Sequence, residues 1–349
     1  MLRGQEQYRK FGRRGCVAVI LLLMPIPSIA KDGAKASRGT ENAKMEPAVL
    51  WTNPTDIASR DLFWGPGGKQ HRPPTRFTFL EEDLNGTNPK FDVRDENGVK
   101  WRVKLGPEAR PETAASRLLW AVGYSASEDY FLSDLRVEQM QRLKRGQKLV
   151  GSDGSMRDVR LKRFAKADKK VGGWSWQQNP FTGTRELNGL RVMMALFNNW
   201  DLKDKNNSIY EEKGDDHDKP VFQYLVSDLG ASFGTTGLEI PIRDSKGNLR
   251  AYSHSKFIRR ISGQYVDFTV PSRASFLCLA DPKEFNMRLR IRWIGRHIPR
   301  DDARWVGQLL SQLSQNQIRD AFRAAGYSQE EVDQFADVVM KRIAELQQL

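Results

Sequence analysis

Apolar and polar residues alternate in several short stretches of the first half of the chain, and this period of two predicts β-strands. Two of the stretches flank Glu96-Asn97-Gly98, whose Asn-Gly pair favours a tight hairpin turn. A second hairpin is expected around a turn at residues 151–155, with strands at 147–150 and 158–161. The strands that flank Glu96–Gly98 are residues 90–95 and 100–105, and the remaining predicted strands are residues 76–80 and 130–132.

Helical periodicity appears next to these strands and dominates the second half. Residues 112–122 carry apolar side chains at helical spacing and end at Gly123, while residues 186–198 are almost wholly apolar and predict a buried helix capped by Thr184 or Thr182. Capping-box patterns at residues 314–317 and 328–331 predict two further helices, separated by Gly326. We therefore expect an α+β fold with two lobes, a strand-rich lobe at 51–163 and a helix-rich lobe at 164–349.

The N-terminal 30 residues have the pattern of a secretory signal peptide. A basic start precedes the apolar run 16–24 and the small-x-small sequence Ser28-Ile29-Ala30, and residues 31–50 read as a flexible linker. A secreted or periplasmic protein is expected, or a membrane-anchored one if the signal is not cleaved. After cleavage Cys278 would be the one remaining cysteine, which excludes an intramolecular disulfide and predicts a buried thiol.

The charge of the chain favours anionic partners. The 349 residues have a net charge of +13, and the segment 142–170 is especially rich in lysine and arginine. This segment is either a solvated surface or a docking face for an anionic membrane or a polyanion. Its aromatic content is limited to Phe164, so no specific nucleic-acid partner is expected.

A run of charged residues follows the predicted buried helix and contains the groups that phosphoryl transfer requires. Asp201 is a candidate catalytic base that could orient an acceptor hydroxyl and take its proton, and Lys203 could neutralise charge on the moving phosphate. Asn206, and Asp228 at the end of a later apolar segment, offer the oxygen ligands that magnesium prefers.

Upstream residues complete this chemistry. Lys104 ends a predicted strand and is the candidate that grips nucleotide phosphates. Glu112, at the start of the next helix, is its expected partner, with Glu108 as the alternative.

The order of these residues resembles that of the protein-kinase-like superfamily, and in particular its atypical branch of HipA-type and phosphatidylinositol kinases. The segment 84–90 is similar to the short phosphate-covering loop of HipA-type enzymes, which makes Gly86 and Lys90 candidate nucleotide-binding residues. The resemblance implies ATP bound between two lobes, magnesium as cofactor, and a phosphate acceptor that it does not identify.

This chain departs from ordinary protein kinases at several points. Asn199-Trp200-Asp201 stands where His-Arg-Asp is common, Leu229 replaces the phenylalanine of the metal motif, and there is neither a G-x-G-x-x-G loop nor an Ala-Pro-Glu motif. Two alternatives therefore stay open: a non-catalytic kinase-like binding module, and a serine hydrolase. The latter would use Ser232 in the Gly-x-Ser-x-Gly at 230–234 with His254 or His297 as base.

Overall fold

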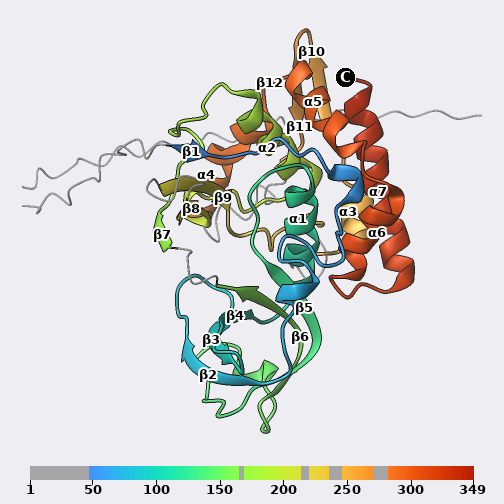
Figure 1. Ribbon diagram of the computed structural model, residues 1–349. Helices are drawn as coiled ribbons and strands as arrows, with labels where there is room; N and C mark the ends of the chain where they lie inside the picture. The colour runs from blue at the N-terminus through green and yellow to red at the C-terminus, as the bar shows by residue number, and fades with distance from the viewer. Residues whose placement is uncertain (1–46, 165–168, 214–219, 236–245, 271–281) are drawn as a thin grey trace, which may run out of the picture. The chain divides into compact units, whose positions relative to one another are not determined.

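An antiparallel five-stranded sheet forms the first part of the structure, a computed structural model that describes residues 47–164, 169–213, 220–235, 246–270 and 282–349. The predicted signal peptide and Cys278 lie outside these residues. The strand order is β2-β3-β4-β6-β5 (Figure 1). The strands are β2 (Phe77–Glu82), β3 (Lys90–Asp95), β4 (Lys100–Lys104), β5 (Asp129–Arg136) and β6 (Ser155–Arg163).

The two outer strands of this sheet are joined by the residues that follow β5. The Glu138 N–H donates to the Phe77 carbonyl at 2.7 Å, and the Phe79 N–H donates to the Glu138 carbonyl at 3.0 Å. These bonds pair the chain beyond β5 with β2, so the sheet closes on itself and the backbone groups at this edge are satisfied. An apolar cluster that includes Trp101 and Val103 is buried on one face of the sheet.

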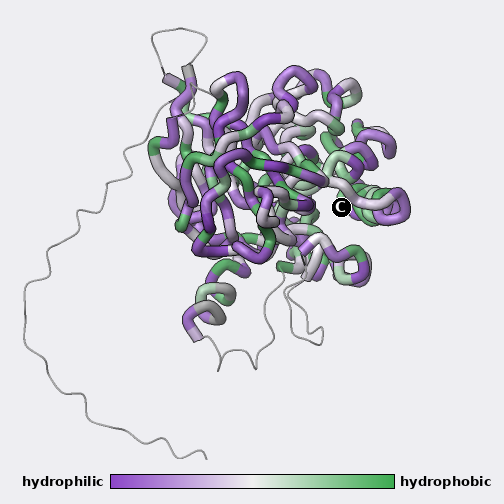
Figure 2. The backbone as a smooth tube through the Cα atoms, turned by 90° about the horizontal axis from the view of Figure 1, so that it is seen from below, coloured by the Kyte–Doolittle hydropathy of each residue, from purple (hydrophilic) through white to green (hydrophobic). Residues whose placement is uncertain are grey.

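The opposite face carries charged side chains, as period-two alternation requires. Lys104 is the register partner of Lys90 on β3 and of Arg160 on β6, so these three cations lie in one row across the sheet. The alternation of hydrophobic and hydrophilic positions can be followed along the backbone in Figure 2.

Helix α1 (Ala109–Ala121) follows β4 directly and packs against β5 and β6. Gly106, with a φ of 87°, turns the chain between the strand and the helix, and Gly123, with a φ of 94°, follows the helix end. Both angles are in the left-handed region, which glycine adopts without a steric penalty.

Helices and two smaller sheets form the rest. The largest core cluster gathers α2 with the C-terminal helices, and residues 44–349 belong to one compact unit. The helices are α2 (Arg185–Leu196), α3 (Leu249–Ser253), α4 (Pro282–Ile291), α5 (Arg300–Leu310), α6 (Gln315–Arg323) and α7 (Gln329–Gln347). A four-stranded sheet has the order β1-β9-β8-β7 and a three-stranded sheet the order β10-β11-β12. Their strands are β1 (Ala48–Val49), β7 (Lys169–Gly172), β8 (Asn207–Lys213), β9 (Pro220–Val226), β10 (Ile258–Ser262), β11 (Tyr265–Phe268) and β12 (Ile298–Pro299).

The predicted α+β class is confirmed, with sheets in the N-terminal part and helices in the C-terminal part. Strand β1 lies within the segment expected to be a linker. Both predicted capping boxes are present, and the Thr184 hydroxyl caps α2 by accepting from the Leu187 N–H. None of the helices in the described ranges is both long and apolar enough to cross a membrane.

The strand predicted at 147–150 is wrong. Gln147–Leu149 form a 3₁₀ turn that follows Gly146 in the left-handed region, and the Gln147 side chain accepts from the Leu143 N–H at 2.7 Å. Strand β6 pairs with β5 and β4 instead of with this segment.

Candidate active site

Lys104 lies at the centre of a cluster of three carboxylates. Its ammonium is 2.7 Å from Glu112 Oε2, 3.0 Å from Glu108 Oε2 and 3.2 Å from Asp228 Oδ1. The Lys104 side chain is 6% exposed. Burial alone would lower its pKa, but the nearby carboxylates raise the pKa above its ordinary value. The lysine therefore stays charged, and residues far apart in the sequence meet at one ammonium group.

The tight connection between β4 and α1 explains two of these contacts. Lys104 is the last residue of β4, and the turn at Gly106 brings Glu108 back against it. Glu112 lies four residues after Glu108, one helical turn further, so both carboxylates project from the same side of α1. The predicted partner Glu112 and the alternative Glu108 thus both contact the lysine.

Glu112 is also held from the neighbouring strand. Arg160 contacts Glu112 Oε2 at 3.1 Å and Asp129 Oδ1 at 3.0 Å, and all three side chains are buried. Burial raises the pKa of Glu112 against the attraction of Arg160 and Lys104. The chain Asp129–Arg160–Glu112–Lys104 fixes the position of α1 relative to the sheet.

Asp228 follows β9 and reaches the cluster from the other half of the chain. The Gly230 N–H donates to Asp228 Oδ1 at 3.2 Å. Burial favours the neutral acid, but the charge of Lys104 and the Gly230 bond lower the pKa of Asp228 to about 2. A Cβ on Gly230 would lie 2.7 Å from the Glu108 Cβ, so any larger residue here would require the backbone at Gly230 and Glu108 to move apart.

The loop that carries Asp201 begins at the end of α2. Asn198 has a φ of 59°, and the Asn199 N–H donates to the Met194 carbonyl at 2.9 Å, which is the hydrogen bond of a Schellman motif. The Asn199 side chain then accepts from the Asp201 N–H at 3.0 Å. The ammonium of Lys203 lies 3.0 Å from Asp201 Oδ1, so the predicted base and the predicted cation are in contact.

Strand pairing brings this loop next to Asp228. Asn207 at the start of β8 is the register partner of Val226 at the end of β9, and the Ser227 N–H donates to the Asn206 carbonyl at 2.8 Å. The Asn206 amide nitrogen donates to the Asp201 carbonyl at 2.7 Å, a bond that does not use the side-chain oxygen. The backbone of Asn206 therefore contacts Ser227, the residue before Asp228, just beyond the end of the β8–β9 ladder.

The loop between β2 and β3 lies near the same cluster. Gly86 has a φ of 70°, and its carbonyl accepts from Arg145. Lys90, the register partner of Lys104, is 3.7 Å from Asp83 Oδ2. The Asn88 amide donates to Glu108 Oε2 at 2.5 Å, which connects this loop directly to the carboxylates.

The carboxylates around Lys104 are oxygen donors of the kind that a hard divalent cation prefers, but the lysine ammonium already lies among the three of them. Glu108, Glu112 and Asp228 each offer a carboxylate oxygen, and these atoms lie within 4.8 Å of one another. The side chain of Asp228 is 32% exposed, so it can be reached from solvent. Oxygen ligands of this kind fit magnesium or manganese.

Three residues of the cluster were not predicted from the sequence: Arg160, Asn88 and Lys246. The ammonium of Lys246 lies 2.5 Å from Glu108 Oε1. Arg160 could be found once the strand register is known, because a charged residue opposite Lys104 on the next strand faces the same side of the sheet. No comparable signal marks Lys246.

The serine hydrolase alternative is not supported. Ser232 is fully buried, and its hydroxyl has no hydrogen-bond partner in the part of the chain that the structure describes. The nucleophile elbow requires a helix directly after the serine, but no helix begins within residues 232–235. The His254 Nδ1 contacts the Arg250 carbonyl, and His297 stacks on Tyr265.

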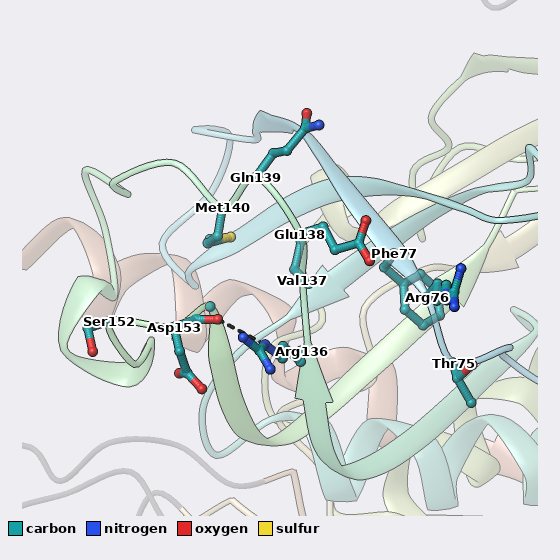
Figure 3. A pocket seen from close by; sticks show the side chains of 11 residues that line it. Thr75, Arg76, Phe77, Arg136, Val137, Glu138, Gln139, Met140, Ser152 and Asp153 are labelled. Carbon is teal, nitrogen blue, oxygen red and sulfur yellow. Dashed lines mark hydrogen bonds between the residues drawn. The ribbon is translucent and has the colours of Figure 1, made fainter.

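A separate surface hollow of about 630 Å³ lies at the end of β5 (Figure 3). Its lining includes none of the residues that contact Lys104. Figure 3 shows Arg136 bonded to the Asp153 carbonyl, at 3.3 Å. The lining combines Arg76 and Arg136 with Glu138 and Asp153, so it has no net charge to attract an anion.

No family model and no curated protein matches this chain. Among solved structures, a proinflammatory kinase, CtkA, of Helicobacter pylori is similar, with 12% identity, a TM-score of 0.39 and coverage of 78% of this chain and 99% of that one. The Golgi casein kinase is also similar, with 12% identity, a TM-score of 0.31 and coverage of 77% of this chain and 75% of that one. A second structure of that kinase, with Mn/ADP bound, gives the same identity and TM-score. Similarity at this level does not assign a function, which has to be inferred from the geometry of the site.

Proposed function

We propose that this chain is a kinase-like phosphotransferase that transfers the γ-phosphoryl group of ATP to an acceptor, with magnesium as cofactor. The observation that carries the proposal is the convergence of Glu108, Glu112 and Asp228 on the buried ammonium of Lys104. A lysine held by a helix glutamate and located beside a metal-binding aspartate is the arrangement that nucleotide phosphates require. The Gly86 loop, in place of a G-x-G-x-x-G, favours the atypical branch of the superfamily.

The proposal assigns a role to each residue. Lys104 binds nucleotide phosphates and is oriented by Glu112, which Arg160 holds in turn. Asp201 orients the acceptor hydroxyl and receives its proton. Lys203, in contact with Asp201, stabilises the negative charge on the transferred group. Gly86, in the β2–β3 loop, and Lys90, at the start of β3, cover the phosphates.

Asp228 and Asn206 would hold the cation. When bound, magnesium neutralises charge on the β- and γ-phosphates and lowers the barrier to transfer. The backbone contact between Asn206 and Ser227, the residue before Asp228, supports this assignment. The contacts of Asp228 with Lys104 and with the Gly230 N–H keep its carboxylate ionised and ready to accept a metal.

The location of the enzyme and its surface partners are part of the same proposal. The expected signal at residues 1–30 would direct the chain out of the cytoplasm, or retain it at a membrane if uncleaved. Several basic residues of the segment 142–170 are exposed and could contact an anionic membrane or polyanion; they are Arg142, Lys144, Lys148, Arg157, Lys169 and Lys170.

The decisive test combines binding and turnover. We expect ATP with magnesium to raise the melting temperature of the wild-type chain, since a ligand that binds only the folded state stabilises it. Turnover of ATP, measured as ADP release, should fall by roughly 10²-fold or more in Asp201→Ala, because the positioned base is lost. Asp228→Ala should lose both turnover and the magnesium-dependent shift in melting temperature.

The control is Asp134→Ala, which removes a carboxylate that is 76% exposed on β5 and should leave both measurements unchanged. Binding of ATP without turnover in the wild type would instead identify a non-catalytic binding module. Absence of both, in a folded protein, would contradict the proposal.

A further inference from the structure

A second lysine reaches the carboxylate cluster from the segment that follows Asp228. The ammonium of Lys246 lies 2.5 Å from Glu108 Oε1 and 5.6 Å from the centre of the Trp200 ring. Its side chain is 16% exposed. Trp200 directly precedes Asp201, so Lys246 lies between the first turn of α1 and the start of the loop that carries the proposed base.

The backbone around Lys246 is fixed by its neighbours. The Gly247 N–H donates to the Ser232 carbonyl at 2.9 Å, and Gly247 has a φ of 60°. Asn248 is the N-cap of α3, and its side chain accepts from the Ala251 N–H at 2.9 Å. A lysine whose backbone is anchored in this way loses little further entropy when it contacts a ligand.

Glu108 has other partners besides Lys246. It also accepts from Lys104 at 3.0 Å and from the Asn88 amide at 2.5 Å. Lys104, in contrast, contacts three carboxylates and is already fixed by them. Within the described ranges Glu108 is the one carboxylate that Lys246 contacts, so this ammonium is the cation in the cluster that can most easily exchange its partner.

We propose that Lys246 is a second phosphate-binding lysine of the nucleotide site, facing the phosphates from the side of the Asp201 loop while Lys104 faces them from the sheet. The inference rests on the proposed function, since it assigns Lys246 to the same site. Two ammonium groups on either side of Glu108 match the multiple negative charges of a nucleoside triphosphate. The Lys246 ammonium also lies 5.6 Å from the centre of the Trp200 ring, a cation–π contact that keeps its charged end beside the site.

Binding of three ligands to Lys246→Met tests this assignment. Methionine retains an unbranched side chain of similar length and removes the charge. We expect the affinity for ATP with magnesium, and for inorganic tripolyphosphate, to fall about tenfold or more, as for the loss of one charge-assisted contact. The affinity for adenosine, which has no phosphate, should stay unchanged. Titration calorimetry measures all three, and Lys246→Arg should retain most of the wild-type affinity for ATP.

The outcomes separate the inference from the function on which it rests. Equal losses for adenosine and tripolyphosphate would mean that Lys246 only supports the structure, and unchanged binding of all three would place it outside the site. Either result overturns the assignment while leaving the phosphotransferase proposal intact. A wild-type chain that binds none of the three ligands contradicts both. Lys341→Ala, which removes an exposed lysine on α7, is the matched control for net charge.

Discussion

At the scale of single residues, the site is organised by buried charges that all have partners. Arg160 is the clearest case, because its guanidinium connects Glu112 and Asp129, each of which is nearly inaccessible to solvent. Removing Arg160 would take this cation from Asp129 and leave Glu112 with Lys104 alone, both in a medium of low polarity, which is strongly destabilising. The energetic effect therefore depends on burial more than on the number of ion pairs.

We accordingly predict that Arg160→Met lowers the free energy of unfolding by about 3–5 kcal/mol, because two carboxylates lose their shared cation. Urea denaturation followed by circular dichroism measures this change. Arg157→Met, on the same strand, is the control: its side chain is 87% exposed and 3.7 Å from Asp134, so its removal should change stability by less than about 0.5 kcal/mol. Similar losses in both variants would show that burial does not govern the Arg160 effect.

At the scale of helices and strands, much of the local structure could be predicted because the signals are local. Period-two alternation predicted β2, β3 and β4, and capping residues predicted the starts of α2, α6 and α7. The 3₁₀ turn at 147–149 was missed because Gly146 redirects a segment whose composition also suits a strand. No feature of the sequence indicates that β1 pairs in parallel with β9, because β1 is only two residues long and β9 is far from it along the chain.

Helix α7 offers a test of capping at this scale. The Ser328 hydroxyl accepts from the Glu331 N–H at 3.3 Å, and the Glu331 side chain accepts from the Ser328 N–H at 2.9 Å. Ser328→Ala should lower the free energy of unfolding by about 1 kcal/mol, because the first turn of the helix loses an acceptor. Thermal denaturation measures the shift, and Ser328→Asp, which retains an acceptor at the cap, should stay close to wild type. A wild-type melting temperature for the alanine variant would contradict the role of the cap.

At the scale of the described unit, the candidate site depends on contacts between residues far apart in sequence. Lys104 and Asp228 are 124 positions apart, and Glu108 and Lys246 are 138 apart. The order of motifs along the chain predicted that Lys104, Glu112 and Asp228 act together, because each motif has a known chemical role. It could not predict Arg160 or Lys246, whose participation depends on strand register and on the path of the chain after Asp228.

Gly230 packs closely against Glu108, and this contact supplies a prediction about how the site is held together. An alanine Cβ there would lie 2.7 Å from the Cβ and from Oε2 of Glu108, so α1 or the Asp228 segment would have to move. We expect Gly230→Ala to lower the free energy of unfolding by about 1–3 kcal/mol, as overpacking does, and to weaken ATP binding because Asp228 moves relative to Lys104. The control is Gly172→Ala on β7, where a new Cβ would meet only the Ile209 side chain at 3.9 Å, an ordinary packing distance. If Gly230→Ala binds ATP as tightly as Gly172→Ala does, the spacing between α1 and Asp228 is not what determines nucleotide affinity.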